Sequence, residues 1–387
     1  MAERYDYVVV GLGGLGSAAA WELAGRGHRV LGLERFGLGH GRGASHDTSR
    51  ILRHSYHTPG YVRLTQEAYA DWARLERESG ERLVTRTGGL DLFPPDPAIP
   101  SIDYTQSMDE VGIAYEALDA YRLQARWPQL RVPDGTLGLF QTAGSIVPAA
   151  RTTATLQDRA RRLGAELRDR TPVVGLEDRG EAGLRVTTTN AEIDCGGVVV
   201  CADAWTNDVV GHLGLRVPLE VTLEQVTYFA VDEPDRFAVG ALPLWIWMDD
   251  PSFYGFPTYG EDTVKAAQDC GGPAVNPDDR TSDPDPEMEA LVAEHVHALL
   301  PGVGAPLRSI RCQYTLTADR DFVMAPVPGH ERVVVGLGAA HAFKFVPTFG
   351  RVLADLVTTG ATTTDVAAFT LDRPAITEPD YAAHWLV

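Results

Sequence analysis

The first 34 residues contain the feature that most constrains the fold. The apolar run Val8–Val10 leads into a GxGxxG motif formed by Gly11, Gly13 and Gly16, small residues follow, and a second apolar run ends on Glu34. Such glycines allow a tight turn, a close approach of backbone to a pyrophosphate, and packing of helix on strand. An acid at Glu34 can accept a hydrogen bond from an unphosphorylated ribose. The sequence therefore predicts a Rossmann-type α/β unit that binds NAD or FAD at the start of a helix.

Two further triple-valine runs, Val198–Val200 and Val333–Val335, resemble the first in being short and followed by small residues. Such runs are typical of parallel strands buried on both faces. If all three belong to one sheet, the nucleotide-binding domain is assembled from distant pieces of chain. Apolar residues at helical spacing also predict helices over 64–75, 156–163 and 288–299.

Composition excludes several classes of protein. The formal net charge of −19 repels phosphate backbones and anionic membranes, and no apolar stretch is long enough to span a bilayer. Four cysteines in 387 residues have no zinc-ligand spacing and predict no disulfide framework. We therefore expect a cytoplasmic protein with no nucleic-acid or membrane partner.

Lysine is almost absent. Of the 34 basic residues only Lys265 and Lys344 are lysines, so arginine supplies the remaining positive charge. Arginine replaces a surface lysine at little cost, but it cannot replace a compact ammonium whose pKa has to move. The two lysines are therefore candidate functional residues, with chance retention as the alternative.

A small, polar segment, 43–54, follows the second predicted strand and reads GASHDTSRILRH. It could wrap the second part of a long dinucleotide and bring Arg50 and Arg53 beside it, which favours FAD over NAD. A nicotinamide enzyme and a cofactor-binding scaffold remain alternatives at this point.

Together with this segment, four later motifs resemble the monomeric sarcosine oxidase and N-methyltryptophan oxidase family of flavoprotein amine oxidases. They are the run Tyr254–Pro257, Lys265, the run Arg311–Thr315 and the run Gly336–Phe345. The resemblance implies an α/β fold with a discontinuous FAD-binding domain and a substrate domain built on an antiparallel sheet. We expect the FAD-binding domain to comprise residues 1–88, 149–215 and 322–387, and the substrate domain residues 89–148 and 216–321.

The resemblance also implies roles for individual residues. Cys312 would hold the flavin covalently, and a thiolate beside Arg311 would be a competent nucleophile. Lys265 would lie by flavin N5 and activate oxygen, and Arg53 with Lys344 would clamp a substrate carboxylate. The other predicted catalytic or substrate residues are Arg50, His341, Tyr314, Tyr254, Trp245 and Asp269. The predicted cofactor-binding residues are Gly11, Gly13, Gly16, Glu34, Arg35, Ser45, His46, Ser49, Arg50, Val173, Cys312 and Lys344.

Three positions depart from the family pattern. Asp269 replaces a histidine, so we expect a raised pKa or a pairing with Lys265 or with a cationic substrate group. An acid there is similar to the branch that oxidises cyclic imino acids such as piperideine-2-carboxylate. Trp245 stands near a methionine position, which makes plain sarcosine doubtful if its ring lines the pocket, with core packing as the alternative. Asp203 replaces a glycine, and the sequence offers no account of that change.

These features predict a monomeric FAD-dependent oxidase of a secondary or cyclic amino acid, which forms an imine and reduces O2 to hydrogen peroxide. Two cations at one pocket favour a carboxylate ligand. The alternatives are a dehydrogenase that uses an acceptor other than oxygen and an imino acid oxidase of a secondary-metabolite pathway.

Overall fold

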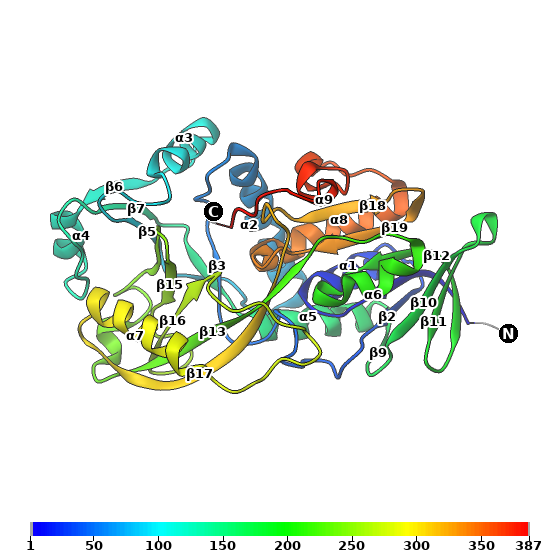
Figure 1. Ribbon diagram of the computed structural model, residues 1–387, viewed down its shortest axis with the longest axis horizontal. Coiled ribbons are helices and arrows are strands. Elements are labelled where there is room, and N and C mark those ends of the chain that lie inside the picture. The colour runs from blue at the N-terminus through cyan, green and yellow to red at the C-terminus, as the bar shows by residue number, and fades with distance from the viewer. Residues whose placement is uncertain (1–2, 386–387) are drawn as a thin grey trace.

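The computed structural model describes residues 3–385, which form two large β-sheets lying in opposite halves of an elongated molecule (Figure 1). The first sheet follows the order β10 (Val173–Asp178), β11 (Leu184–Thr188), β12 (Glu192–Val200), β1 (Glu3–Val10), β2 (Val30–Leu33) and β9 (Glu166–Arg168), with β19 (His330–Leu337) beside β12 and β18 (Val323–Val327) beside β19. The second follows the order β17 (Val303–Leu316), β13 (Glu220–Val231), β16 (Thr263–Asp269), β15 (Ser252–Phe256), β14 (Leu244–Trp247), β5 (Gly89–Phe93), β7 (Leu137–Gln141) and β6 (Glu116–Asp119).

The three valine runs lie side by side in the first sheet. Val8–Val10 pair in parallel with Val198–Val200, which in turn pair in parallel with Val333–Val335. All nine side chains are buried, and the middle valine of each run packs into a different apolar cluster from its two neighbours. The prediction of a sheet buried on both faces and assembled from distant segments is therefore correct.

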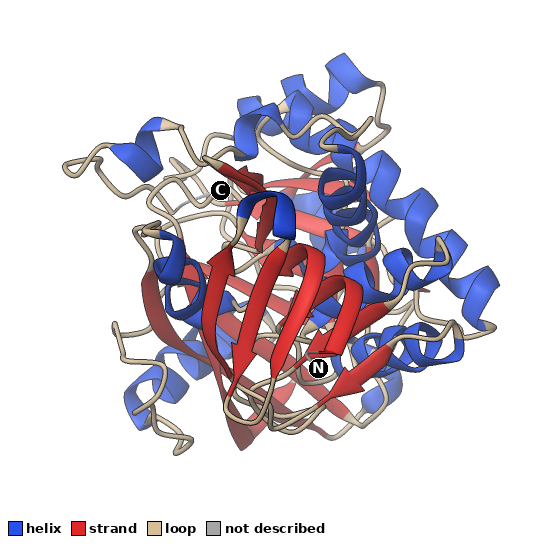
Figure 2. Ribbon diagram, turned by 90° about the vertical axis from the view of Figure 1, so that its right-hand side faces the viewer, coloured by secondary structure: helices blue, strands red, loops and turns tan. Residues whose placement is uncertain are grey.

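Helices cover one face of this sheet, as the end-on view shows (Figure 2). They are α1 (Gly14–Gly25), α5 (Ala149–Arg162) and α8 (Val346–Thr359), and α1 contacts both of the others. The long helix α2 (Pro59–Ser79) packs on α8, begins after the Thr58 cap and ends at Gly80 in a left-handed conformation. The shorter helix α6 (Thr206–Val210) contacts β12 and β10.

The second sheet is antiparallel except where β14 pairs in parallel with β5, a detail that the sequence did not predict. Helix α7 (Pro286–Leu299) packs on β13, β16 and β17. Helices α3 (Ser101–Val111) and α4 (Ala120–Arg126) are associated with the β5–β7 end, where Figure 1 shows them. The predicted domain boundaries remain a proposal that follows the distribution of strands between the two sheets.

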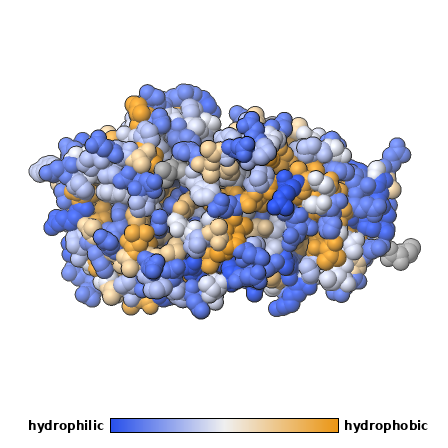
Figure 3. All heavy atoms as spheres, viewed as in Figure 1, coloured by the Kyte–Doolittle hydropathy of each residue, from blue (hydrophilic) through white to orange (hydrophobic). Residues whose placement is uncertain are grey.

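A third, small sheet joins segments from the two halves, with the order β3 (Arg50–Leu52), β8 (Ser145–Val147) and β4 (Thr85–Arg86). It fixes the chain that carries Arg50 and Arg53. The face drawn in Figure 3 is mostly polar, with apolar residues scattered over it. Among residues 3–385, no helix is both long and apolar enough to cross a membrane.

The contact between α1 and α8 predicts a sharp steric effect at Gly350. A Cβ atom added there would lie 2.7 Å from the Ala18 carbonyl carbon, so the two helices would have to separate. We expect Gly350→Ala to lower the free energy of unfolding by roughly 1–3 kcal/mol, measured by chemical denaturation. The control is Gly60→Ala on α2, where a Cβ would meet nothing within 4 Å. Equal stability of the two variants would contradict this packing.

Candidate active site

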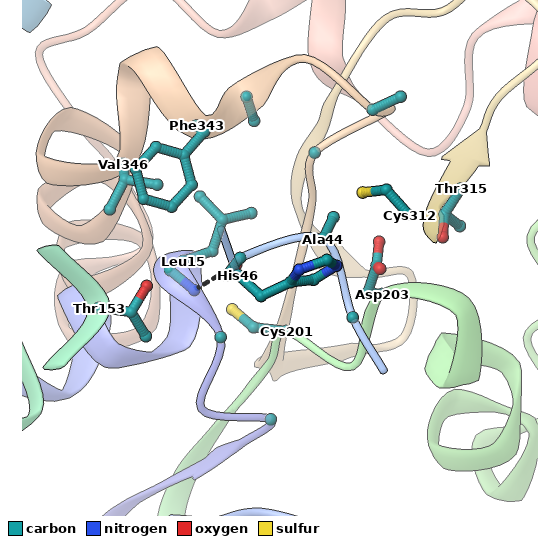
Figure 4. A pocket seen from close by; sticks show the side chains of 18 of the residues that line it. Leu15, Ala44, His46, Thr153, Cys201, Asp203, Cys312, Thr315, Phe343 and Val346 are labelled. Carbon is teal, nitrogen blue, oxygen red and sulfur yellow. Dashed lines mark hydrogen bonds between the residues drawn. The ribbon is translucent and has the colours of Figure 1, made fainter. Parts of the chain in front are cut away.

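One continuous cavity of about 570 Å³ lies at the carboxyl ends of the valine strands. The residues that follow these strands line it, namely Gly11–Leu15 after β1, Cys201–Asp203 after β12, and Gly338 with Ala340–Lys344 after β19. The carboxyl edge of a parallel sheet is where α/β folds bind ligands. Figure 4 shows the pocket from close by, with Phe343, Val346 and Leu15 on one side and Cys312 and Asp203 on the other.

The glycine motif leaves no room for side chains. Gly11 has φ +89°, and a Cβ atom there would collide with the Cys201 carbonyl. A Cβ atom on Gly16 would collide with the Gly11 carbonyl, so Gly16 serves the close approach of α1 to β1 rather than the cavity wall. The backbone N–H of Gly14 points to Ser45, whose Oγ accepts from it at 2.9 Å. This is the backbone cradle that a pyrophosphate needs.

Glu34 ends β2 and lines the cavity, as a ribose-binding acid should. Its two oxygens accept backbone N–H bonds from Leu12 and Phe36, both at 2.9 Å, and one lies 3.3 Å from His40 Nε2. Burial alone would raise the pKa of this carboxyl, but the hydrogen bonds from His40 and the backbone lower it on balance. Glu34 is therefore a fixed anion.

Most of the predicted site residues line this one cavity, although they come from distant parts of the chain. Those that line it are Gly11, Gly13, Glu34, Arg35, Ser45, His46, Arg50, Arg53, Val173, Tyr254, Asp269, Cys312, Tyr314, His341 and Lys344. The predicted residues outside the lining are Gly16, Ser49, Trp245 and Lys265.

Cys312 on β17 is buried, and its sulfur points into the pocket (Figure 4). The prediction that Arg311 activates it is wrong, because neighbouring residues of a strand face opposite sides. Arg311 instead donates to Gln225 Oε1 at 3.2 Å and to the Leu223 carbonyl at 3.0 Å. Burial raises the pKa of the Cys312 thiol, and the positive charges of Arg50 and Lys265 oppose that rise.

Asp203 lies near Cys312 in the same view, and its backbone has φ +49°. Left-handed backbone favours glycine, and aspartate tolerates it better than most residues, which accounts for the exchange of a glycine for Asp203. Its Oδ2 accepts from Gln313 Nε2 at 3.4 Å. Burial raises the pKa of this carboxyl. The structure thus explains a substitution for which the sequence gave no reason.

Lys265 lies just outside the cavity lining in a buried cluster. Its Nζ donates to Asp47 Oδ2 at 2.6 Å, to Ser49 Oγ at 3.1 Å and to the Ser49 carbonyl at 3.2 Å. Tyr228 also donates to Asp47. Burial lowers the pKa of Lys265 to about 8, although Asp47 opposes that shift. Asp47 has its pKa held at about 2, because the Lys265 ammonium outweighs the effect of burial.

Arg50 lines the cavity beside this cluster, and its guanidinium is fixed by three carbonyls. It donates to the carbonyl oxygens of Ser49 at 2.8 Å and of Ala44 and His46, both at 3.0 Å. The 43–54 segment is thereby folded around Arg50. The prediction that this segment brings a cation to the nucleotide site agrees with its position.

A second group of side chains surrounds Tyr56, and we call it the Tyr56 cluster. The Arg53 guanidinium carbon and Lys344 Nζ lie 5.2 and 5.4 Å from the centre of the Tyr56 ring. The Tyr56 hydroxyl lies 3.3 Å from His341 Nδ1. The cluster comprises Arg53, Tyr56, Asp269, Arg320, His341 and Lys344, all of which line the cavity.

The two cations predicted to clamp a carboxylate differ in their partners. Arg53 forms a buried ion pair with Asp91 at 2.7 Å, which the sequence did not predict. Lys344 Nζ donates to the His341 carbonyl at 2.8 Å and forms no salt bridge within the described residues. Burial, reinforced by the charges of Arg53 and Arg320, lowers the pKa of Lys344 well below its usual value. A bound carboxylate would reverse this shift.

His341 is fixed at both ring nitrogens. Its Nε2 lies 2.9 Å from the Arg320 carbonyl, which can only accept, so Nε2 carries the hydrogen and Nδ1 can accept from Tyr56. Burial lowers the pKa of His341 well below its usual value, which keeps the ring neutral.

Asp269 does not pair with Lys265, which corrects one of the expectations for this residue. Its two oxygens accept from Arg320 Nη2 at 2.9 and 2.8 Å. Arg320 follows β17 in a loop, shortly after the run Arg311–Thr315 but outside it. Of the groups in the Tyr56 cluster, Tyr56 and Arg320 are the two that the sequence did not predict.

Trp245 was predicted to line the substrate pocket, and this is wrong. Its side chain is fully buried in the core under the second sheet, where its ring lies 5.7 Å from that of His295. Ile246, the next residue of β14, lines the cavity instead, because successive side chains of a strand alternate between faces. The argument from Trp245 against a small substrate therefore does not hold. His295 stacks on Phe253 at 4.1 Å between the ring centres.

The residues present fit a dinucleotide. A glycine turn in which a Cβ atom at Gly11 would collide with backbone, the start of α1 with its Gly14 N–H bonded to Ser45, and a fixed acid at the end of β2 are the parts that would hold pyrophosphate and ribose. The cavity continues past Arg50 and Cys312 to the Tyr56 cluster, so it has room for a second portion of a long cofactor beside a substrate.

Comparisons with known proteins agree with this geometry. The chain is 36% identical over 384 residues to the monomeric sarcosine oxidase of Streptomyces avermitilis, covering 95% of this chain and 97% of that protein. It is 27% identical over 384 residues to the N-methyl-L-tryptophan oxidase of Shigella flexneri, covering 96% and 99%. A structure of NikD, described as an unusual amino acid oxidase essential for nikkomycin biosynthesis, matches with a TM-score of 0.85 and 29% identity, covering 95% and 97%.

These findings confirm the predicted fold class, the predicted dependence on FAD rather than NAD, and the resemblance stated from the motifs. Residues 6–356 match the family described as FAD dependent oxidoreductase. The chain belongs to this FAD dependent oxidoreductase family.

Proposed function

We propose that the protein is an oxidase of amino acids whose amine is secondary or cyclic, and that it forms an imine and hydrogen peroxide. The observation that carries the proposal is the buried Lys344 side chain, which borders the cavity without a carboxylate partner among residues 3–385. Its charged form is disfavoured there, and a substrate carboxylate is the group that would stabilise it. The relatives named sarcosine oxidase support the same substrate class.

The residues that would hold FAD are the glycine turn, Glu34, the 43–54 segment and Cys312. When bound, FAD would accept the two electrons of the substrate C–N unit as one hydride, and the two electrons with two protons would convert O2 to hydrogen peroxide. We propose that Cys312 carries the cofactor covalently, since its sulfur faces the cavity near Arg50 and Lys265.

The chain's own residues would act on the substrate by binding and orientation. Lys344 would bind the carboxylate. Arg53 is already paired with Asp91, so it would contribute to the electrostatic potential around the carboxylate rather than supply an unpaired charge. The His341 ring is neutral. Beside it, the amine of the bound substrate would be free to lose its proton. Tyr254 and Tyr314 would form the walls beside the C–N unit. Holding a substrate in one geometry contributes much of a rate enhancement.

Lys265 would act on oxygen. Its ammonium is desolvated yet remains protonated beside Asp47, and a fixed cation in a water-poor site stabilises the superoxide anion formed by one-electron transfer. We also propose a monomeric, cytoplasmic protein: the relatives named monomeric support the first, and the four free cysteines support a reducing compartment.

The function is tested by anaerobic mixing with sarcosine, N-methyltryptophan, proline, pipecolate and piperideine-2-carboxylate. We expect at least one to bleach the flavin absorbance, and air to restore it with one peroxide formed per substrate. Lys344→Met should weaken binding of that substrate by roughly 10- to 100-fold, because its carboxylate loses an ammonium partner. Bleaching by none of the five, or by a reduced nicotinamide alone, would contradict the proposal.

A second arm separates an oxidase from a dehydrogenase. Lys265→Met should leave anaerobic bleaching in place and slow the return of colour in air, because the cation that favours oxygen reduction is gone. Peroxide production at the wild-type rate in this variant would exclude the role proposed for Lys265.

Covalent attachment predicts a simple result on acid precipitation. The yellow colour should stay with the denatured wild-type protein and should pass into the supernatant for Cys312→Ser, whose hydroxyl is a far weaker nucleophile than a thiolate. Cys201→Ser, at another buried cysteine of the cavity, is the control and should keep the colour in the pellet. A colourless wild-type pellet would exclude the covalent bond.

The buried ammonium of Lys265 predicts a dependence of stability on pH. Its pKa is about 8 in the folded protein against 10.5 for an ordinary lysine, so between these pH values the unfolded chain binds a proton that the folded one has released. The free energy of unfolding should therefore rise with pH across this window, by on the order of 2–3 kcal/mol, relative to Lys265→Met. Denaturation curves at pH 7.5 and 10 measure the difference.

Lys265→Arg serves as the control for this experiment, because its guanidinium keeps its proton over the whole range and should also lack the rise. Parallel pH profiles for wild type and Lys265→Met would show that the lysine does not titrate in the folded protein as described.

A further inference from the structure

An ion pair borders the cavity within the Tyr56 cluster. Arg320 is 4% exposed, and its Nη2 donates to both carboxylate oxygens of Asp269, at 2.9 and 2.8 Å. The Asp269 side chain keeps about a fifth of its surface exposed. Both residues line the cavity, so their charges face whatever ligand occupies it.

The charges of this region balance to a single positive unit. Arg53 is paired with Asp91 and Arg320 with Asp269, and Lys344 forms no salt bridge within residues 3–385. When a ligand carboxylate is bound, Lys344 is charged, so the protein itself contributes three cations and two carboxylates. A buried charge without a partner costs free energy. The net charge of a pocket therefore strongly limits which ligand charges it can bind.

Arg320 is held in place by the end of the chain. Its Nη1 donates to the Trp385 carbonyl at 2.6 Å, and its own carbonyl accepts from His341. The same loop accepts two more hydrogen bonds from the tail: His384 N donates to the Ala318 carbonyl at 2.7 Å, and Trp385 Nε1 to the Thr317 carbonyl at 3.1 Å.

Arg320 adopts a left-handed backbone with φ +59°, an uncommon conformation for a residue with a long side chain. The loop around it is anchored elsewhere too, since Arg373 Nε donates to Asp319 Oδ2 at 2.6 Å and Tyr61 donates to Asp321 Oδ1 at 2.6 Å. Contacts from three distant segments therefore fix the guanidinium against Asp269.

We propose that Arg320 and Asp269 determine substrate specificity by holding the Tyr56 cluster, together with Asp91, at one net positive charge, and that the tail through Trp385 positions Arg320 for this. The inference rests on the proposed amino acid oxidase function and narrows it to substrates with one carboxylate and an uncharged remainder. A dicarboxylate would bring a second anion against Asp269, and a cationic side chain would meet Arg320.

Removing Arg320 and removing Asp269 should change the net charge of the cluster in opposite directions. Arg320→Gln leaves the Asp269 carboxylate uncompensated and cancels the charge of Lys344, so the cavity should bind anions weakly. Asp269→Asn leaves Arg320 uncompensated and raises the net charge to two, so the cavity should admit a second carboxylate. The double variant restores the original net charge. Loss of a merely structural contact would weaken binding in both single variants.

The experiment titrates the flavin-loaded protein with acetate and with malonate at pH 8 and constant ionic strength, and follows the flavin absorbance. Neither ligand is oxidised, so binding is read independently of turnover. We expect wild type to bind acetate more tightly than malonate, Arg320→Gln to lose about 10-fold in acetate affinity, and Asp269→Asn to gain about 10-fold for malonate, the size expected of one unit charge several ångströms away. The double variant should keep the wild-type preference.

Two variants guard against a change of fold. Arg320→Lys keeps the cation and should keep the preference for acetate, whereas Arg162→Gln removes an exposed ion pair with Asp158 on α5 and should change nothing. Weaker binding of both ligands in both single variants, or an unchanged preference in all of them, would overturn the proposal. Normal binding without flavin bleaching by any of the five candidate substrates would instead reject the oxidase function.

The tail is tested by ending the chain at Ala383, which removes the Trp385 carbonyl and leaves both members of the ion pair. Acetate affinity should fall in the same direction as in Arg320→Gln, because Arg320 is no longer held against Asp269. An unchanged acetate affinity, with the protein equally stable to heat, would show that the tail does not position Arg320.

Discussion

The parallel pairing of β1, β12 and β19 is the constraint on which the site depends. Because the three valine runs are in register, the segments that follow them emerge at one edge of the sheet. This brings Gly11, Asp203 and His341 to one cavity although they are far apart in sequence. Valines buried on both faces leave this edge little freedom to shift, so the glycine turn and the Tyr56 cluster keep a fixed separation.

The second constraint is electrostatic. The cavity is bordered by several buried charges, and most have a partner: Lys265 with Asp47, Arg53 with Asp91, and Arg320 with Asp269. Such pairs contribute little net stability compared with apolar residues of the same size. These pairs instead fix the electrostatic potential inside the cavity. Lys344, which has no carboxylate partner in the described chain, is the group that remains for an anionic ligand.

The sequence predicted the parts of this arrangement that rest on local pattern. The glycine spacing, the valine runs and the helix over 64–75 depend on neighbours in the chain, and the structure has each of them. The two lysines, which composition alone singled out, are both buried at or beside the cavity. The errors came from two sources. Trp245 was placed on the wrong face because its apolar strand, β14, carries no alternation to read. Arg311 is next to Cys312 in the chain, and adjacent residues of a strand face opposite sides.

Asp91 and Arg320 were missed for a different reason: each acquires its role through a partner that is 38 or 51 residues away. A single sequence carries no signal for such pairs. Tertiary pairing also overturned the alternative that Asp269 pairs with Lys265, since each of the two has another charged partner, Arg320 for Asp269 and Asp47 for Lys265.

The most direct test of the account is a crystal structure of the FAD-loaded protein with acetate bound. The account predicts the isoalloxazine ring between Cys312 and the Tyr56 cluster, and the acetate carboxylate within about 3 Å of Lys344 Nζ. Acetate bound elsewhere in the cavity, with Lys344 still donating only to the His341 carbonyl, would contradict it.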